Sequence, residues 1–183
     1  MAVGVFFAEG FEEIEGLTVV DLLRRAGVET KMVSVTGLKQ VTGSHGILVG
    51  MDETIEEMDF DALDMIVLPG GMPGTRNLEG CEKLVSRIKE FAATGKALAA
   101  ICAAPTVFGH LGLLEGQPAC CYPGMEGELT GAAVTMEAVA KGEKIITSRG
   151  MGTAIEFGLA IIEYFQGKEA TDKMAGSIVY HRK

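Results

Sequence analysis

Short hydrophobic runs alternate along this chain with segments in which apolar residues recur at helical spacing. The runs predict buried strands at Val3–Phe7, Glu29–Val35, Met65–Leu68, Ala97–Ile101, Ala119–Tyr122 and Ile145–Ser148. The helical spacing predicts helices over Glu12–Ala26, around Leu84–Ala92, just after Cys102 and from about Thr153. The glycines between Gly37 and Asp64 suggest a hairpin. This alternation of strands and helices is typical of a parallel sheet wrapped by helices.

Length and composition fit one α/β domain that spans residues 1–183. Domains usually hold about 100–200 residues, and 48% hydrophobic with 22% charged residues is the composition of a globular protein. The chain has 16 Lys and Arg against 25 Asp and Glu, which gives a net charge of −9. Because no basic cluster is present to neutralise phosphates, we expect no nucleic-acid partner.

Compartment is suggested by three features of the sequence. Residues Ala97–Leu114 include no Asp, Glu, Lys or Arg, but Pro105 and Gly109 interrupt them, so we expect a strand, a turn and a helix there and no membrane contact. The start of the chain has no basic leader, which argues against a secretory signal. Four cysteines in a chain of this length do not make a disulfide framework. We therefore expect a reduced, cytoplasmic protein.

Three predicted strand ends carry the candidate chemistry. Ligands of open parallel sheets bind beyond the carboxyl ends of the strands. The acidic turn Glu9–Glu15 follows the first predicted strand, the pair Gly70–Gly71 follows the strand Met65–Leu68, and Cys102 follows the strand Ala97–Ile101. We expect these three segments to meet in one crevice.

Cys102 lies where a strand turns tightly into a helix. The positive end of that helix favours a thiolate, and small neighbours permit the strained backbone of a nucleophile elbow. The backbone N–H groups of Gly71 and Ala103 could bind the oxyanion formed when the sulfur attacks a carbonyl. The position also fits a small buried cysteine without a reactive role, so both interpretations stay open at this point.

Glu15 belongs to a group of three glutamates at a helix start, with Glu12 and Glu13. A helix dipole favours carboxylates there even without a catalytic role. A carboxylate beside a thiolate would repel it and raise both pKa values. Glu15 therefore assists Cys102 only if it is protonated, either as a hydrogen-bond donor to the sulfur or as a proton shuttle.

Cofactor sites are not expected. Cys120 and Cys121 are adjacent and the histidines are scattered, which does not fit the ligand spacing of a zinc site. The cluster Gly70–Gly74 matches neither a P-loop nor a dinucleotide fingerprint. Tyr122 ends a predicted strand, where it either presents its hydroxyl to the crevice or packs at the sheet edge.

Four segments together resemble the signatures of a known family. Ala99–Pro105 resembles the elbow of the ThiJ/PfpI superfamily, in the branch that contains the parkinsonism-associated deglycase. Glu12–Glu15, Val67–Gly71 and Thr147–Thr153 resemble its other signatures, in the same order. The likeness extends from Val3 to about Lys168, and this resemblance favours functional roles for Cys102 and Glu15.

The resemblance implies a flavodoxin-like three-layer sandwich with a mainly parallel sheet, and a homodimer. It implies that Cys102 is the nucleophile, that Glu15 is the acid bonded to its sulfur, and that Gly71 and Ala103 supply the oxyanion N–H groups. The residues expected to contact the substrate are Gly70, Tyr122 in place of a family histidine, and His45 in place of an arginine that the partner subunit contributes.

The resemblance also implies a cofactor-independent glyoxalase or deglycase that acts on small 2-oxoaldehydes such as methylglyoxal, or on their adducts. The alternative is a redox sensor or chaperone in which Cys102 is oxidised to a sulfinate. Ala103 departs from the Cys-His pair of the protease-like branch. His181 is followed only by Arg182 and Lys183, which departs from the late His-x-Glu of glutamine amidotransferases. Neither of those functions is expected.

Overall fold

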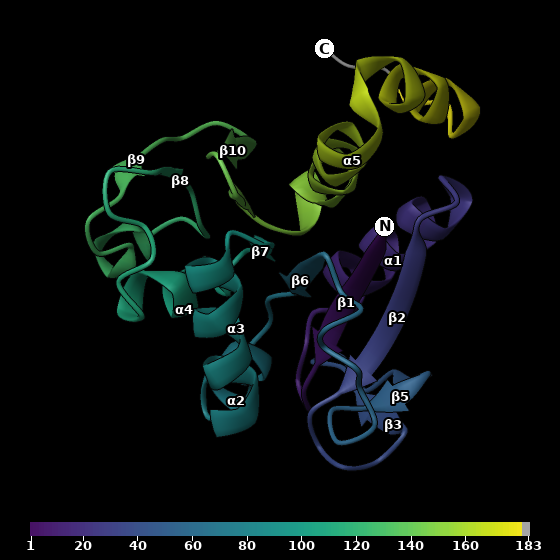
Figure 1. Ribbon diagram of the computed structural model, residues 1–183, viewed down its shortest axis with the longest axis vertical. Coiled ribbons are helices and arrows are strands. Elements are labelled where there is room, and N and C mark those ends of the chain that lie inside the picture. The colour runs from purple at the N-terminus through teal and green to yellow at the C-terminus, as the bar shows by residue number, and fades with distance from the viewer. Residues whose placement is uncertain (181–183) are drawn as a thin grey trace.

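A central sheet of seven strands organises the protein (Figure 1). The computed structural model describes residues 1–180, so His181, Arg182 and Lys183 lie outside the described residues. The strand order is β10-β11-β7-β6-β1-β2-β5, and every neighbouring pair is parallel except β10 and β11. The strands are β1 (Ala2–Phe7), β2 (Glu29–Ser34), β5 (Glu53–Thr54), β6 (Met65–Leu68), β7 (Ala97–Ile101), β10 (Val139–Lys141) and β11 (Ile145–Ser148). The predicted parallel sheet is thus confirmed.

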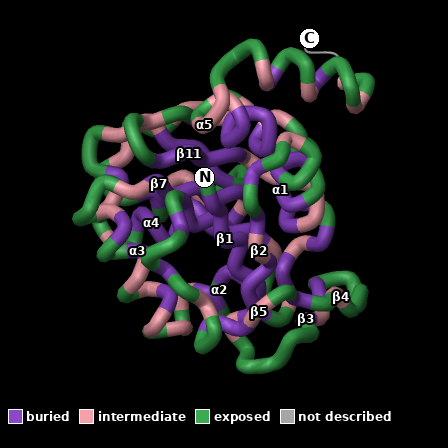
Figure 2. Tube along the Cα trace, turned by 45° about the vertical axis from the view of Figure 1, so that its right-hand side comes forward, coloured by how far each residue is buried: buried purple, intermediate pink, exposed green. Residues whose placement is uncertain are grey.

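Helices cover both faces of the sheet and complete a three-layer sandwich (Figure 2). The helices α1 (Glu13–Arg25) and α5 (Ala154–Ser177) pack on one face. The helices α2 (Gly74–Glu79), α3 (Glu82–Thr94) and α4 (Pro105–His110) pack on the other. Side chains of a strand point alternately to the two faces. Val3, Val5 and Phe7 accordingly join the first core, whereas Phe6 joins the second.

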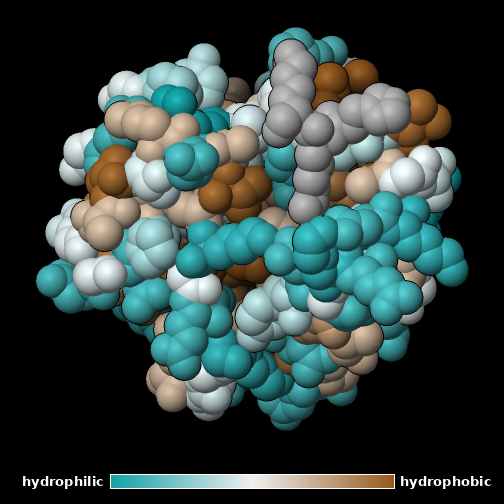
Figure 3. Space-filling model, turned by 90° about the horizontal axis from the view of Figure 1, so that it is seen from above, coloured by the Kyte–Doolittle hydropathy of each residue, from teal (hydrophilic) through white to brown (hydrophobic). Residues whose placement is uncertain are grey.

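The last helix bends where the sequence shows continuous helical spacing. Gly167 has φ 80° and ψ 176° inside α5, so the chain turns there and a second helical segment begins. Thr171 and Ala175 of that segment are buried, while other parts of it face solvent (Figure 2). The surface at this end of the molecule shows hydrophobic patches separated by hydrophilic residues (Figure 3).

Two small sheets lie outside the central one. The strands β3 (Gln40–Thr42) and β4 (Leu48–Gly50) form the predicted hairpin. The strand β8 (Pro118–Ala119) pairs with β9 (Ala133–Val134), so the strand predicted over Ala119–Tyr122 ends at Ala119, which corrects that prediction. The reason is that the next N–H groups bond elsewhere: Cys120 N–H donates to Thr147 Oγ1, and Tyr122 N–H donates to Cys102 O.

The segment Ala97–Leu114, which contains no Asp, Glu, Lys or Arg, forms β7, a turn and α4, as predicted. Within residues 1–180, no helix is long and apolar enough to cross a membrane. Single-turn 3-10 helices, η1 (Glu126–Glu128) and η2 (Met151–Thr153), complete the secondary structure around the carboxyl ends of β7 and β11.

Candidate active site

The loops after β1 and β6 interlock through their backbones. Glu12 N–H donates to Gly70 O at 2.9 Å, and Gly74 N–H donates to Gly10 O at 3.1 Å. At Gly71 the backbone has φ 91°, and a Cβ atom there would lie 2.3 Å from Glu12 N. Only glycine combines this left-handed conformation with so close an approach. The acidic turn and the glycine pair are therefore held together, as the strand ends predicted.

Cys102 sits directly after β7 in a left-handed backbone conformation, with φ 66°. Its N–H donates to Ser148 O at 3.0 Å, and its carbonyl oxygen accepts from Tyr122 N–H at 2.7 Å. These two bonds hold a conformation that costs a non-glycine residue roughly 1–3 kcal/mol. The strained turn predicted for this position is present, and the thiol is half-buried.

Glu15 points from the first turn of α1 to Cys102. Its carboxyl group is buried, accepts from Gly70 N–H at 3.0 Å and hydrogen-bonds the Cys102 side chain. A Cβ atom on Gly70 would lie 2.5 Å from Cys102 Cβ and 2.7 Å from Glu15 Oε2. The absence of a side chain at Gly70 is thus what lets the carboxyl group and the thiol meet.

Burial raises the pKa of both groups in this pair. The pKa of Glu15 rises to about 7, because burial outweighs the hydrogen bonds from Cys102 and Gly70 N–H. Burial, and then the charge of Glu15, raise the pKa of Cys102 to about 12, against the lowering effect of the Gly71 and Ala103 N–H groups. The N–H groups at the helix start thus favour the thiolate, as predicted, but burial and the predicted repulsion by Glu15 outweigh them.

The pair instead carries a single negative charge between about pH 7 and pH 12. One proton is then left on the pair, mainly on the sulfur because its pKa is the higher of the two, and the titration belongs to the pair. When the proton is on Glu15, the thiolate accepts from the Gly71 and Ala103 N–H groups. When it is on Cys102, the carboxylate accepts from Gly70 N–H. Each form of the pair has its own backbone donors.

Tyr122 lies at the rim of this site. A Cβ atom built on Gly150 would be 3.6 Å from Tyr122 Cδ2 and 4.0 Å from Glu15 Oε1, so the ring and the carboxyl group flank the same glycine. Tyr122 is 52% exposed. The ring is thus next to the site and open to solvent, rather than packed at a sheet edge.

His45 contacts the helix start and not the thiol. Its backbone N–H donates to Glu13 Oε1 at 2.8 Å, and its Nδ1 lies 3.0 Å from Glu13 Oε2. These bonds join the β3–β4 hairpin to α1. The contact of His45 with substrate, expected across a dimer, stays a prediction.

Glu12, Glu13 and His45 also form a group that sequence spacing missed. One potential ligand atom from each lies within 4.8 Å of the others. His45 is 32 residues away from Glu13, so no local motif marks the group. Hydrogen bonds among these side chains and Ser44 account for the arrangement without an ion.

The Glu13–His45 pair predicts a pH-dependent stability. Burial raises the pKa of Glu13, but hydrogen bonds from the His45 side chain and from backbone N–H groups outweigh it and hold the pKa at about 2. The contribution of Glu13 to the free energy of unfolding is therefore complete above about pH 4.5 and is lost as the pH falls toward 2. Bonding to Glu13 raises the pKa of His45, so its contribution is complete below about pH 6.5 and is lost above its folded pKa.

We expect His45→Ala to lower the melting temperature by a few degrees, most between about pH 4.5 and 6.5. Thermal melts from pH 2 to 9 measure the difference from the wild type. Arg25→Ala is the control, because its ion pair with Asp21 contains no group with a reference pKa between 5 and 9. A deficit for His45→Ala that stays constant across that range would contradict the prediction.

A family model, described as DJ-1/PfpI family, matches residues 1–164. The chain belongs to the DJ-1/PfpI family. It is 38% identical to Protein DJ-1 homolog B of Arabidopsis thaliana over 94% of its length, but spans only 40% of that protein. It is 30% identical to the glutathione-independent glyoxalase DJR-1.2 of Caenorhabditis elegans, over 91% of this chain and 89% of that protein.

A solved DJ-1 structure has the same fold. The oxidized DJ-1 of Toxoplasma gondii superposes with a TM-score of 0.95 at 37% identity, covering 99% of both chains. The predicted flavodoxin-like sandwich and the DJ-1 branch are therefore confirmed. These similarities support a DJ-1 family role for the chain.

Site residues that the sequence did not single out come mainly from the loop after β11. Ser148 anchors Cys102, and Gly150 separates Glu15 from Tyr122. The only sequence signal for this loop was the family-like segment Thr147–Thr153, within which no residue was given a role.

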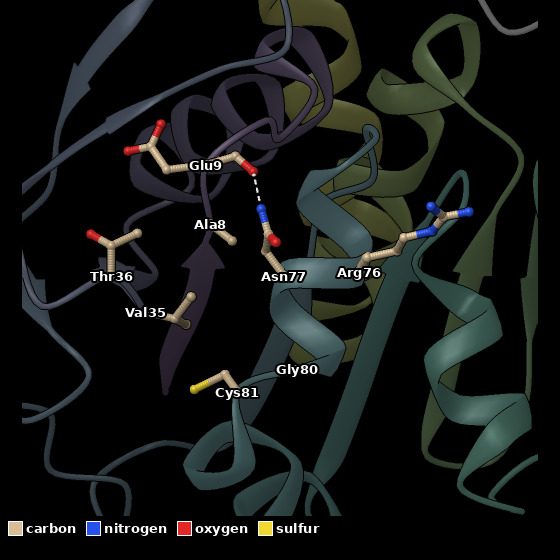
Figure 4. A pocket seen from close by; sticks show the side chains of 8 residues that line it. All are labelled: Ala8, Glu9, Val35, Thr36, Arg76, Asn77, Gly80 and Cys81. Atoms are coloured by element: carbon tan, nitrogen blue, oxygen red, sulfur yellow. Dashed lines mark hydrogen bonds between the residues drawn. The ribbon is translucent and has the colours of Figure 1, made fainter.

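A different pocket, of about 390 Å³, lies beyond the ends of β1 and β2 (Figure 4). It is lined by Ala8, Glu9, Val35, Thr36, Arg76, Asn77, Gly80 and Cys81. The Asn77 side chain donates to Glu9 O at 2.8 Å across its upper edge. None of the residues predicted for the DJ-1 site lines this pocket, which makes the half-buried Cys81 a suitable internal control for Cys102.

Proposed function

We propose that this DJ-1 family member is a cofactor-independent enzyme that converts small 2-oxoaldehydes such as methylglyoxal to 2-hydroxy acids. The observation that supports this most directly is the Cys102–Glu15 pair, in which a buried carboxyl group with a raised pKa meets a half-buried thiol beside the Gly71 and Ala103 N–H groups. A nucleophile with an adjacent acid–base group and two oxyanion donors is what carbonyl addition requires. The C. elegans relative named a glutathione-independent glyoxalase supports the same chemistry.

The reaction begins with addition to the aldehyde. The Cys102 thiolate forms a C–S bond, and the carbonyl π electrons move to oxygen, where the N–H groups of Gly71 and Ala103 donate to the oxyanion. Protonated Glu15 gives its proton to that oxygen, which produces a neutral hemithioacetal and a Glu15 carboxylate.

Glu15 then moves a proton between the two carbons. Its carboxylate removes the C1 proton, which gives an enediolate with its negative charge on the C2 oxygen. Glu15 then returns that proton to C2 while the C1 hydroxyl proton passes to the C2 oxygen, and the C1 oxygen forms the carbonyl double bond. The product is a 2-hydroxyacyl thioester of Cys102, which water cleaves to the hydroxy acid and the free thiol. The sum is methylglyoxal plus water to lactic acid, with no oxidant or reductant.

Deglycation begins with a displacement instead: the Cys102 thiolate forms its C–S bond to the adduct carbon as the bond from that carbon to the adducted thiol or amine breaks, and protonated Glu15 gives its proton to the leaving group. The later steps are the same.

We propose that Gly70, Tyr122 and His45 contact the substrate. Gly70 provides the space beside the sulfur, and Tyr122 replaces the family histidine at the rim. The proposal includes a homodimer in the reducing cytoplasm, in which the partner subunit's His45 reaches the rim of the site.

Lactate formation tests the proposed reaction directly. We expect freshly reduced wild-type protein to convert methylglyoxal to lactate without glutathione or added metal, measured by a coupled lactate assay. Absence of lactate from protein whose Cys102 is shown by mass to be a free thiol would overturn the proposal.

A second function, redox sensing, is favoured by the chemistry around the same sulfur. The Gly71 and Ala103 N–H groups and a protonated Glu15 are donors suited to sulfinate oxygens. The similar T. gondii structure is of an oxidized DJ-1.

We expect mild peroxide to add 32 Da at Cys102, measured by peptide mass after digestion. Cys120 and Cys121 are buried and serve as internal controls. Oxidation spread equally over all three cysteines would contradict a sensing role.

A further inference from the structure

The segment Tyr122–Glu128 begins beside the proposed active site. Tyr122 N–H donates to Cys102 O at 2.7 Å, and Met125 N–H donates to Tyr122 O at 3.1 Å, which closes a turn. Within residues 1–180, the Tyr122 hydroxyl makes no hydrogen bond. The position of the ring is therefore set by the backbone of its segment rather than by contacts of its own hydroxyl.

Glu126 connects this turn to the loop after β11. Its Oε2 accepts from Gly124 N–H at 2.8 Å, inside the turn. Its Oε1 lies 3.8 Å from Arg149 Nη2, and each side chain is about one-quarter exposed. Arg149 is flanked by Ser148, which accepts from Cys102 N–H, and by Gly150, which lies next to the Tyr122 ring. The ion pair thus joins the Tyr122–Glu128 segment to the loop after β11, and both begin beside the same site.

Arg149 has a buried donor that is not used. Its Nε is buried and has no hydrogen-bond partner among residues 1–180. Its positive charge also lowers the pKa values of Cys120 and Cys121, against the effect of burial. Because these cysteines directly precede Tyr122, the guanidinium lies near the start of the Tyr122–Glu128 segment. Glu126 is the carboxylate that Arg149 contacts there.

The far end of the segment has a separate anchor. His110 of α4 lies between two carboxylates, with Nδ1 2.6 Å from Glu79 Oε1 and Nε2 3.2 Å from Glu128 Oε2. Loss of Arg149 therefore releases the middle of the turn at Glu126, while Tyr122 N–H stays bonded to Cys102 O and η1 stays attached to α4.

We propose that Arg149 and Glu126 are positioning residues whose ion pair holds the Tyr122 turn against Cys102, so that the Tyr122 ring limits access to the sulfur and contacts the substrate. The substrate contact rests on the proposed function, whereas the control of access does not. Neither residue touches the reacting atoms in this arrangement, and both act through Tyr122.

Alkylation of Cys102 tests the inference without turnover. We expect Arg149→Gln to increase the rate of iodoacetamide addition at Cys102 about 3- to 10-fold, measured by peptide mass over time. Arg149→Lys, which keeps the charge, should give a smaller increase. Arg87→Gln breaks the distant Arg87–Glu90 ion pair and should leave the rate unchanged.

Two comparisons distinguish positioning from simple loosening of the fold. Tyr122→Ala alone should also increase the rate of iodoacetamide addition at Cys102. Combining it with Arg149→Gln should give no further increase in that rate, because the ring through which Arg149 acts is gone. Cys120 and Cys121 should stay unreactive in every variant. An unchanged or slower rate for Arg149→Gln, an effect that persists without the ring, or parallel exposure of Cys120 and Cys121 would overturn the inference.

Turnover provides a further readout if the proposed reaction holds. Arg149→Gln should raise KM for methylglyoxal about 3- to 10-fold and change kcat less than about twofold, because it disturbs a substrate contact and not the proton transfer. A drop in kcat with unchanged KM would overturn the substrate contact. If wild-type protein forms no lactate, the proposed function fails, and the alkylation results still decide whether Arg149 positions Tyr122.

Discussion

Replacing Cys102 with Ala is expected to reduce lactate formation from methylglyoxal by roughly 10³-fold or more, to the rate in buffer. Without the sulfur no hemithioacetal forms, and Glu15 has no bound intermediate on which to act. The substitution removes little volume and leaves the Ser148 and Tyr122 backbone bonds available. The variant should therefore fold, and its melting temperature is measured alongside its activity.

The matched control is Cys81→Ala. Cys81 is also half-buried, but it lines the pocket beyond β1 and β2 instead of the proposed site. Activity within about twofold of the wild type is expected for this variant, since nothing near Cys102 changes. Equal loss of lactate formation in both variants would contradict the assignment of Cys102 as the nucleophile.

The central strands were predictable because each strand buries both of its faces. In β7, Ala97, Ala99 and Ile101 face one core while Leu98 and Ala100 face the other, so the run is continuously apolar. The antiparallel strand β10 was not predicted, because its three residues, Val139–Lys141, have no such run. The bend at Gly167 was missed because helical spacing continues on both sides of it.

The sequence predicted those parts of the site that directly follow buried strands. Cys102, Gly70 and Gly71 each follow a buried strand, and sheet topology alone brings them together. The contacts of His45 with Glu13, and of Arg149 with Glu126, join side chains more than 20 residues apart with no shared spacing. The sequence indicated two opposing effects on the pKa of Cys102, the helix start and the neighbouring carboxylate, but not their balance, which burial of the thiol decides.

Glu15→Gln should separate the two roles that the Cys102–Glu15 pair combines. Gln keeps an oxygen that accepts from Gly70 N–H but cannot give or take a proton. We expect lactate formation to fall about 10²- to 10⁴-fold, which is the usual effect of removing a general acid–base group. Because the negative charge of Glu15 also disappears, the pKa of Cys102 should fall.

The variant should therefore lose turnover without losing a reactive thiol. Alkylation of Cys102 by iodoacetamide at pH 8 is expected to be at least as fast as in the wild type, because more of the sulfur is thiolate. In the wild type, kcat/KM should rise with pH up to about 7, as the pair gives up its first proton. This rise should be absent from Glu15→Gln near pH 7, where Glu15 no longer titrates. If alkylation and turnover fell by the same factor, Glu15 would serve only to make the sulfur reactive, and a separate proton-transfer step would have no support.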